Sequence, residues 1–206
     1  MRNDTIESFL QSLAARVPAP GGGATAALHA AQAAALVAMV ARYSDGPRYA
    51  AHAEEIVRIS STADALREEA LTLAEHDAAA FTAVTDAYRL PKGSADEAAQ
   101  RSAAIAEAVL AAARPPAAVV GVAGSVLDLA EALLPIGNPN VVSDIAAAAE
   151  AARAAATTAR VNIEINLAGI TDAVARDELL DHARAVDVLA ERADKLTAAV
   201  RSELTR

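Results

Sequence analysis

The chain of 206 residues has no cysteine and no tryptophan, and only 2% of its residues are aromatic. The absence of cysteine excludes disulfide bonds and thiolate metal sites. The chain has 18 Lys and Arg residues against 27 Asp and Glu residues, a net charge of -9. The basic residues form no cluster, which argues against a nucleic-acid partner. Metal-ligand spacings of His and Glu, phosphate loops and dinucleotide fingerprints are also missing, so the sequence predicts no metal and no bound cofactor.

The N-terminus also lacks the apolar stretch of a signal peptide, which predicts a cytoplasmic protein. Residues 24–41 carry no charge, but they are mostly alanine and include Thr25, His29 and Gln32. A buried helix or a dimer interface therefore explains this segment better than a membrane span. We expect neither a membrane nor a nucleic acid among the partners.

What the chain has in excess is alanine, which supplies most of a hydrophobic fraction of 54%. Alanine is the best helix former, but it buries little area, so alanine-rich helices must pack closely and share wide interfaces. The composition predicts an all-α protein that pairs with a second copy of itself, most simply as a C2 homodimer. We expect one domain over residues 1–206, an up-and-down bundle of six or seven helices.

Capping and turn residues divide the chain into helical segments. Ser94 and Glu97 have the spacing of a capping box, and Pro115 with Pro116 indicates the start of a separate helix. Residues 161–167 alternate like a half-buried strand, but helical patterns on both sides favour a helix. After a short first helix, the expected helices cover residues 24–42, 48–88, 95–114, 115–133, 143–168 and 172–204.

Three glycines, Gly21, Gly22 and Gly23, immediately precede the helix predicted from residue 24. Glycine lets the backbone approach a ligand closely, and the unpaired amides of a first helical turn attract an anion. A flexible connector is the other explanation, and a bare run of three glycines on its own favours the connector.

Asp77 falls on the apolar stripe of the long third helix, a poor place for a carboxylate without a reason. One hypothesis is a general acid or base whose pKa is shifted by burial. A structural carboxylate paired with an arginine is about as common. Neighbouring His76 is expected to face the solvent.

Other polar residues mark helix starts and one helix face. Ser143 and Asp144 suit a helix cap and the positive end of the helix dipole. Asn162 and Asn166 are four residues apart and share one face, although asparagine is a mediocre helix former. They could bind a polar ligand or bond each other across a dimer interface, and the sequence favours neither.

Taken in order, several motifs resemble the cyclodeaminase/cyclohydrolase family of folate enzymes. The resemblance runs from about Ile6 to Asp172, and no single motif decides it. The matching pieces are residues 18–23 (Pro-Ala-Pro-Gly-Gly-Gly), 39–41 (Met-Val-Ala), 77–81 (Asp-Ala-Ala-Ala-Phe), 87–92 (Ala-Tyr-Arg-Leu-Pro-Lys) with Arg101, 137–140 (Gly-Asn-Pro-Asn) with Ser143 and Asp144, and 162–167 (Asn-Ile-Glu-Ile-Asn-Leu) with Asp172.

The resemblance implies an all-helical, dimeric enzyme that acts on the carbon between N5 and N10 of a tetrahydrofolate. Both reactions of the family need a base and an acid, for which Asp77 and Asp144 are the candidates. The anionic glutamyl tail implies contacts with Lys92, Arg101 or the glycine loop. The full set of implied substrate-binding residues is Gly21, Gly22, Gly23, Lys92, Arg101, Asn138, Asn140, Ser143, Asn162 and Asn166.

Four departures from the family's pattern remove a hydroxyl or a positive charge. Ala24 and Ala19 stand where Ser and Thr are common, residues 44–49 lack the usual lysines, and Glu164 occupies an often basic position. The resemblance leaves methenyltetrahydrofolate cyclohydrolase and formiminotetrahydrofolate cyclodeaminase both open. The missing formiminotransferase domain leans slightly toward the cyclohydrolase. The departures support a different alternative, a family member that has lost catalysis and acts as a helical binding protein.

Overall fold

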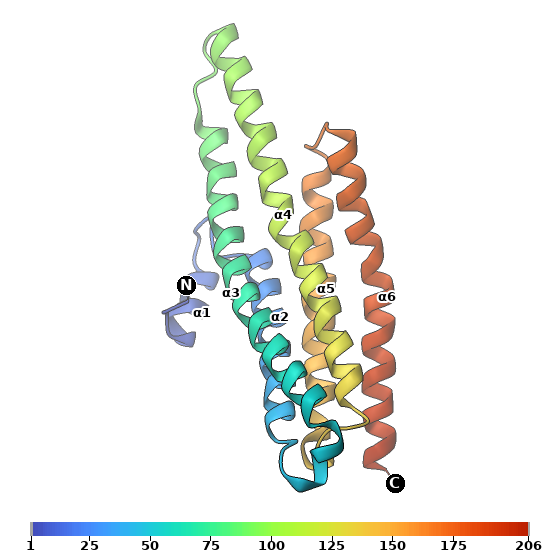
Figure 1. The fold of residues 1–206 in the computed structure, drawn as a ribbon. Helices are drawn as coiled ribbons and strands as arrows, with labels where there is room; N and C mark the ends of the chain where they lie inside the picture. Colours follow the sequence, from blue (N-terminus) through green and yellow to red (C-terminus); the bar gives the residue numbers. More distant parts are fainter. Residues whose placement is uncertain (1, 206) are drawn as a thin grey trace.

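The protein is an all-α bundle, as predicted. The computed structural model describes residues 2–205, in which there are six α-helices, two short 3₁₀-helices and no β-strand. The long helices run alternately up and down (Figure 1). Their order is α1 (Ile6–Ala14), α2 (Gly22–Arg42), η1 (Pro47–His52), α3 (Ala53–Arg89), α4 (Ala95–Leu133), η2 (Pro139–Val141), α5 (Val142–Leu167) and α6 (Ala173–Leu204).

Helix α2 forms the centre of the core and packs against α3, α4 and α5. Most of its buried residues are alanines, which lets the four helices approach closely. Helix α6 packs on the outer side of α4 and α5. By length and composition α2 and α4 could each span a membrane, but 61% of each such window is buried inside the bundle, as in the core helices of a soluble protein.

Helix α4 differs from the prediction because it continues through Pro115 and Pro116. Each proline removes an amide, so the carbonyl groups of Ala111 and Ala112 lose their partners within the helix. Both prolines are buried, and the apolar residues after them pack into the same core as those before them. Tertiary packing thus outweighs the local tendency of the two prolines to begin a new helix.

The α3–α4 hairpin extends beyond the start of α2 and forms an arm at the top of Figure 1. Helix α2 begins beside Asp77, whereas α3 continues to Arg89 before the chain turns. The turn ends in the predicted capping box: Ser94 Oγ accepts the amide of Glu97, and the Glu97 carboxylate accepts the amide of Ser94. The arm therefore carries residues 78–89 of α3 past the end of the central helix.

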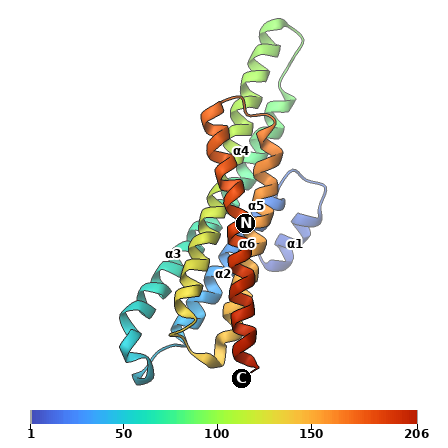
Figure 2. The ribbon, with the colours of Figure 1, turned by 90° about the vertical axis from the view of Figure 1, so that its right-hand side faces the viewer.

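Helix α1 lies beside the bundle rather than in it (Figure 2). None of its residues is buried, and Ile6 and Leu10 are 81% and 53% exposed. The chain before it is tied to α3 by Arg2, whose guanidinium donates to Glu68 Oε2 at 3.0 Å and to Thr72 Oγ1 at 2.9 Å. The exposed apolar residues of α1 are available for a further contact.

Helix α5 is continuous through residues 161–167, so the helical interpretation of that alternating segment is confirmed. Its start differs from the prediction: the N-cap position is Val141, which makes no side-chain bond, and Asn138 instead caps the preceding η2. Ser143 and Asp144 therefore lie inside the first turn. The last helix begins where it was expected, and Asp172 caps α6 by accepting the amides of Val174 and Ala175.

Candidate active site

The start of α2 is built from glycine because another side chain occupies the space beside it. Gly21 is the N-cap and makes no side-chain bond, and the helix begins at Gly22. A Cβ atom on Gly23 would lie 1.9 Å from Asp77 Oδ1, closer than any real contact. Only glycine at this position lets the carboxyl group of α3 rest against the first turn of α2.

Asp77 supplies the cap that α2 lacks in its own sequence. Its carboxyl group accepts a hydrogen bond from the amide of Ala24, one of the first-turn donors that have no partner within the helix. Burial raises the pKa of the Asp77 carboxyl, and the bond from Ala24 opposes part of that rise. Within residues 2–205 no Lys, Arg or His forms a salt bridge with Asp77, so the arginine-paired alternative is not supported. His76 is exposed, as predicted.

One asparagine of α5, Asn162, lies beside the same helix start, and Asn166 follows it one turn later on α5. Asn162 Nδ2 is 3.4 Å from the position that a Cβ on Gly22 would take. Asn162 donates to the carbonyl of Thr158, and Asn166 donates to the carbonyl of Asn162, both at 2.8 Å. These bonds hold the two amide groups on their own helix and leave each Oδ1 atom as an acceptor for a ligand. Gly21, Gly22, Gly23, Asp77, Asn162 and Asn166 are thus the predicted residues that the fold groups together.

A second group of predicted residues lies at the other end of the bundle. Asn138 donates through its backbone amide to Ser44 Oγ at 2.8 Å and through Nδ2 to the carbonyl of Tyr43 at 2.7 Å. Asp144 precedes Asn162 by 18 residues on α5, which is about 27 Å along the helix axis. Within one chain, Asp77 and Asp144 therefore cannot act on the same carbon. The members of this group are Asn138, Asn140, Ser143 and Asp144.

Lys92 and Arg101 lie at the tip of the arm. Lys92 is exposed in the turn, and Arg101 donates through Nη2 to the carbonyl of Tyr88 at 3.1 Å. Tyr88 follows Asp77 by 11 residues, about 16 Å along α3. The two cations can therefore reach only the far end of a ligand that extends from Asp77.

Three of the four departures from the family pattern lie at positions whose contacts the structure shows. Ala24 is fully buried, and it contributes its backbone amide rather than a side chain. Ser44 is also buried, and its hydroxyl donates to the carbonyl of Val40 at 2.8 Å, so it has a structural role far from Asp77. Glu164 is exposed and forms an ion pair with Arg160. Sequence reasoning missed the role of the Ala24 amide, because a backbone donor leaves no signal in residue type.

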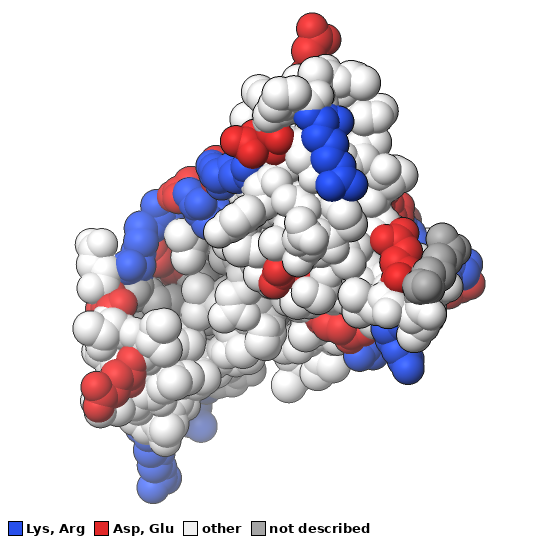
Figure 3. Space-filling view, turned by 90° about the horizontal axis from the view of Figure 1, so that it is seen from below, with Lys and Arg blue, Asp and Glu red and all other residues white. Residues whose placement is uncertain are grey.

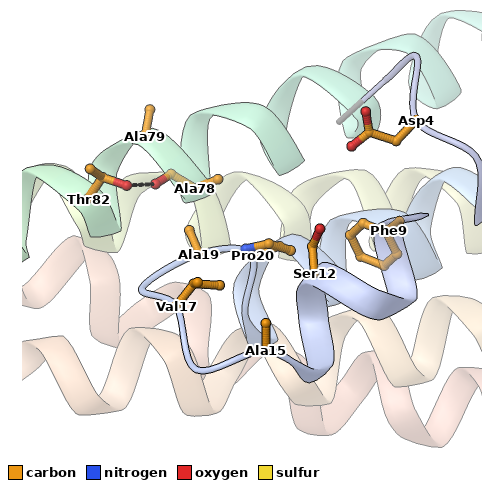
Figure 4. A pocket seen from close by; sticks show the side chains of 10 residues that line it. All are labelled: Asp4, Phe9, Ser12, Ala15, Val17, Ala19, Pro20, Ala78, Ala79 and Thr82. Atoms are coloured by element: carbon orange, nitrogen blue, oxygen red, sulfur yellow. Dashed lines mark hydrogen bonds between the residues drawn. The ribbon is translucent and has the colours of Figure 1, made fainter. Parts of the chain in front are cut away.

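One pocket near this region lies between α1 and α3 (Figure 4). It has a volume of about 530 Å³ and is lined on one side by Phe9, Ser12 and Pro20 and on the other by Ala78 and Thr82. It contains none of the predicted site residues, although Ala78 is the neighbour of Asp77. A second, more apolar pocket of about 420 Å³ lies between α1 and the outer side of α2.

The charged groups give no further site at the lower end of the bundle. Seen from the end where α4 finishes and α5 begins, Lys and Arg side chains are interspersed with Asp and Glu side chains (Figure 3). In the part of the chain that the structure describes, no three His, Asp or Glu residues are grouped so that they could hold a metal ion. The start of α2 therefore remains the candidate site.

Fold and site together define an all-helical protein that holds an unpaired carboxyl group at the N-terminus of a buried helix, an arrangement suited to proton transfer. A sequence model of the formiminotransferase-cyclodeaminase family matches residues 5–185. The chain therefore belongs to this family, and the resemblance seen in its motifs is confirmed.

The relatives are similar over most of this chain. The methenyltetrahydrofolate cyclohydrolase of Methylorubrum extorquens is 38% identical over 86% of this chain and 86% of that protein. The formimidoyltransferase-cyclodeaminase of Mus musculus is 31% identical over 84% of this chain, which spans only about a third (32%) of that longer relative. The crystal structure of formiminotetrahydrofolate cyclodeaminase from Thermotoga maritima matches with a TM-score of 0.83 and 28% identity, covering 97% of this chain and 98% of the other.

Proposed function

We propose that this protein is a methenyltetrahydrofolate cyclohydrolase, which adds water to the carbon between N5 and N10 and opens the ring to a formyl group. The observation that carries the proposal is the unpaired Asp77 carboxyl at the start of α2. Similarity over most of both chains to the Methylorubrum cyclohydrolase supports this reaction over others of the family. The retained carboxylate does not favour a family member that has lost catalysis.

Asp77 acts as the base and then as the acid of this reaction. The ionised carboxylate attracts the cationic methenyl carbon and takes a proton from the attacking water as the C–O bond forms. That proton passes to the solvent. Asp77 next takes the hydroxyl proton of the adduct and delivers it to N5 as the C–N5 bond breaks and the formyl C=O forms. One water is consumed and one proton is released, so we propose that no cofactor beyond the folate substrate takes part.

The first turn of α2 supports the oxygen of the adduct. The amides of Gly22 and Gly23 precede the Ala24 amide that binds Asp77, and no residue between 2 and 205 accepts a hydrogen bond from either of them. Donors held in this way stabilise negative charge that develops on an oxygen during the reaction, and the helix dipole adds to the effect. Glycine at both positions leaves room beside these amides for the side chains of Asp77 and Asn162.

We further propose a homodimer that unites the two separated groups of predicted residues. A two-fold axis crossing α2 near Gln32, midway between its ends, would lay the start of α2 in one chain beside the end of α2 in the other. Asp144 of one copy would then reach the Asp77 site of its partner. The outer side of α2 supports such a contact, because Gln32 is exposed and Leu36 and Met39 are only half-buried.

The second candidate is formiminotetrahydrofolate cyclodeamination, supported by the fold match to the Thermotoga cyclodeaminase. In that reaction N10 attacks the formimino carbon, Asp77 takes the N10 proton, and the same proton leaves with ammonia. The carbon and the base are the same, so the geometry of Asp77 serves both reactions.

The cytoplasmic location expected from the sequence also remains a prediction.

Two absorbance assays on the purified protein test the proposal. Methenyltetrahydrofolate should disappear faster than in buffer alone, with 10-formyltetrahydrofolate as the product, and Asp77→Asn should remove the added rate. Formation of methenyltetrahydrofolate and ammonia from formiminotetrahydrofolate, without hydrolysis of methenyltetrahydrofolate, would instead establish the second candidate. A protein that accelerates neither reaction contradicts both.

A further inference from the structure

The core-facing stripe of α3 changes from buried to exposed where α2 begins. Below Asp77 the stripe is buried against α2, for example at Ala70 and Ala74. Above it, Phe81 and Tyr88 follow Asp77 by four and eleven residues and so lie on the same face of the helix. They are 47% and 55% exposed. Because α2 starts beside Asp77, no central helix covers these two aromatic rings.

At the upper end of this stripe, Arg101 provides a positive charge that could bind an anion. The Arg101 guanidinium lies 5.5 Å from the centre of the Tyr88 ring and donates to the Tyr88 carbonyl. Arg101 forms no salt bridge with any carboxylate in residues 2–205. The acidic residues nearby are engaged, since Asp86 pairs with Arg89 and Glu97 accepts the amides of Gly93 and Ser94.

The spacing along the stripe follows the order of chemical groups in the substrate. With a rise of about 1.5 Å per residue, Phe81 lies about 6 Å beyond Asp77 and Tyr88 lies about 16 Å beyond it. In a folate the benzoyl ring is attached directly to N10, and the glutamate follows on its far side. A folate whose reacting carbon is at Asp77 thus has its benzoyl ring at the level of Phe81 and its glutamate carboxylates below Arg101.

We propose that Phe81 and Arg101 are the specificity-determining contacts for the aminobenzoyl-glutamate part of the substrate. Phe81 stacks on the benzoyl ring, and Arg101, backed by Tyr88, binds a glutamate carboxylate. This inference rests on the proposed folate function and sets the direction of the substrate: the tail leaves along the arm and not under α1. The open pocket around Phe9 is the competing position.

Four variants of the full chain separate these positions. Phe81→Leu keeps an apolar side chain but removes the aromatic face, and Phe9→Leu makes the same change in the competing pocket. Arg101→Gln removes the cation at the arm. Its control, Arg114→Gln, removes an exposed cation elsewhere on α4 that forms no salt bridge within residues 2–205. Hydrolysis of methenyltetrahydrofolate gives kcat and KM for each, and p-aminobenzoate and p-aminobenzoyl-glutamate serve as competitive inhibitors.

We expect Phe81→Leu and Arg101→Gln each to raise KM roughly tenfold with little change in kcat, because the contacts lie away from the reacting carbon. Phe81→Leu should weaken both inhibitors. Arg101→Gln should weaken only p-aminobenzoyl-glutamate, since p-aminobenzoate has no glutamate. Phe9→Leu and Arg114→Gln should match the unmodified protein in every measurement.

Three results would overturn the inference in distinguishable ways. If the unmodified protein does not act on methenyltetrahydrofolate, the proposed function fails and the inference fails with it. If it does, but KM rises for Phe9→Leu and not for Phe81→Leu, the substrate lies under α1. If Phe81→Leu leaves KM unchanged and instead shifts the sedimentation coefficient, a second copy of the chain covers the stripe.

Discussion

The backbone groups at the two ends of α2 are hydrogen-bonded by different means. At the C-terminal end neutral groups from Ser44 and Asn138 make the bonds. Ser44 Oγ donates to the carbonyl of Val40 and accepts the amide of Asn138, while Asn138 Nδ2 donates to the carbonyl of Tyr43. At the N-terminal end no side chain of the preceding loop bonds to the helix. The acceptor there is Asp77, which comes from another helix and carries a charge that burial disfavours.

The contrast indicates which polar residues are free for chemistry. Hydrogen bonds among neutral groups at the C-terminal end satisfy buried backbone donors and acceptors without an ionised side chain, which is the ordinary structural solution. A partly buried carboxyl without a cationic partner opposes folding, so its presence at the N-terminal end needs another benefit. The proton transfer that we propose for that carboxyl would provide it.

The largest effect should come from replacing Asp77. Asp77→Asn keeps the shape and the cap but removes the titrating group, so turnover should fall by between about a hundredfold and ten-thousandfold. The melting temperature should stay the same or rise, because asparagine caps helices as well as aspartate does. Asp77→Ala should lose turnover equally but also lose about 1 kcal/mol of stability with the cap. Equal melting temperatures for the two variants would show that Asp77 does not cap α2.

The raised pKa of Asp77 makes both activity and stability depend on pH. The reaction needs the carboxylate, so kcat/KM should fall at low pH with an apparent pKa above the ordinary aspartate value. Between the ordinary and the raised pKa the folded state binds more protons than the unfolded state, so stability contributed by Asp77 decreases as the pH rises through that window. Asp77→Asn should lack this decrease, which denaturant titrations across the acid range can measure.

Gly23→Ala should have the next largest effect. Its Cβ would force the Asp77 carboxyl away from the Ala24 amide, and displacement of a catalytic group by about 1 Å can cost roughly a hundredfold in turnover. The short side chain of Asp77 can rotate away, so the helical signal should persist. Gly121→Ala on the exposed side of α4 meets nothing within 4 Å and serves as the control. Unchanged turnover in Gly23→Ala would show that activity does not depend on holding Asp77 beside the Ala24 amide.

The sequence predicted the fold well because the helices are long and their signals are strong. The Ser94–Glu97 capping box and the start of the last helix at Asp172 were predicted correctly, since both depend on local chemistry alone. Pro115 was misread because its local signal opposes the packing of α4 on four neighbouring helices, α2, α3, α5 and α6. Packing partners depend on the whole chain and cannot be inferred from residues near the proline.

The candidate site was predicted only in part. Asp77 stood out because it interrupts an apolar stripe, and the structure gives that stripe a partner in α2. The roughly 27 Å between Asp144 and the Asp77 region could not be foreseen, because motif order does not say which helix ends meet. The sequence marks Phe81 only as part of a motif, since its exposure depends on where α2 begins.

A smaller effect, confined to stability, should follow a change at the C-terminal end of α2. Ser44→Ala leaves the amide of Asn138 without its acceptor, which should cost about 1–3 kcal/mol of unfolding free energy. Turnover per folded molecule should not change. Denaturant melts and a turnover assay on the same sample give both values. A fall in turnover with unchanged stability would mean that the Ser44 hydroxyl acts in the reaction rather than in the fold.

The last prediction concerns mixed dimers and expects the smallest signal, a recovery to about a quarter of normal turnover. If Asp144 of one chain completes the Asp77 site of its partner, Asp144→Asn and Asp77→Asn homodimers should both be nearly inactive. Unfolding and refolding the two variants together produces mixed dimers in about half of the pairs. In each mixed dimer one site carries both changes and the other carries neither, so half of their sites are intact.

A site contained within one chain predicts a different outcome. Asp144 would then contribute only a favourable charge at the start of α5, worth about 0.3–1 kcal/mol of stability, and Asp144→Asn would turn over normally without mixing. The mixture would show the average of the two variants, about half of normal turnover, whether or not it was refolded. A refolded mixture of two inactive variants that regains activity can be explained only by sites shared between chains, which would join the two ends of α2 in one catalytic centre.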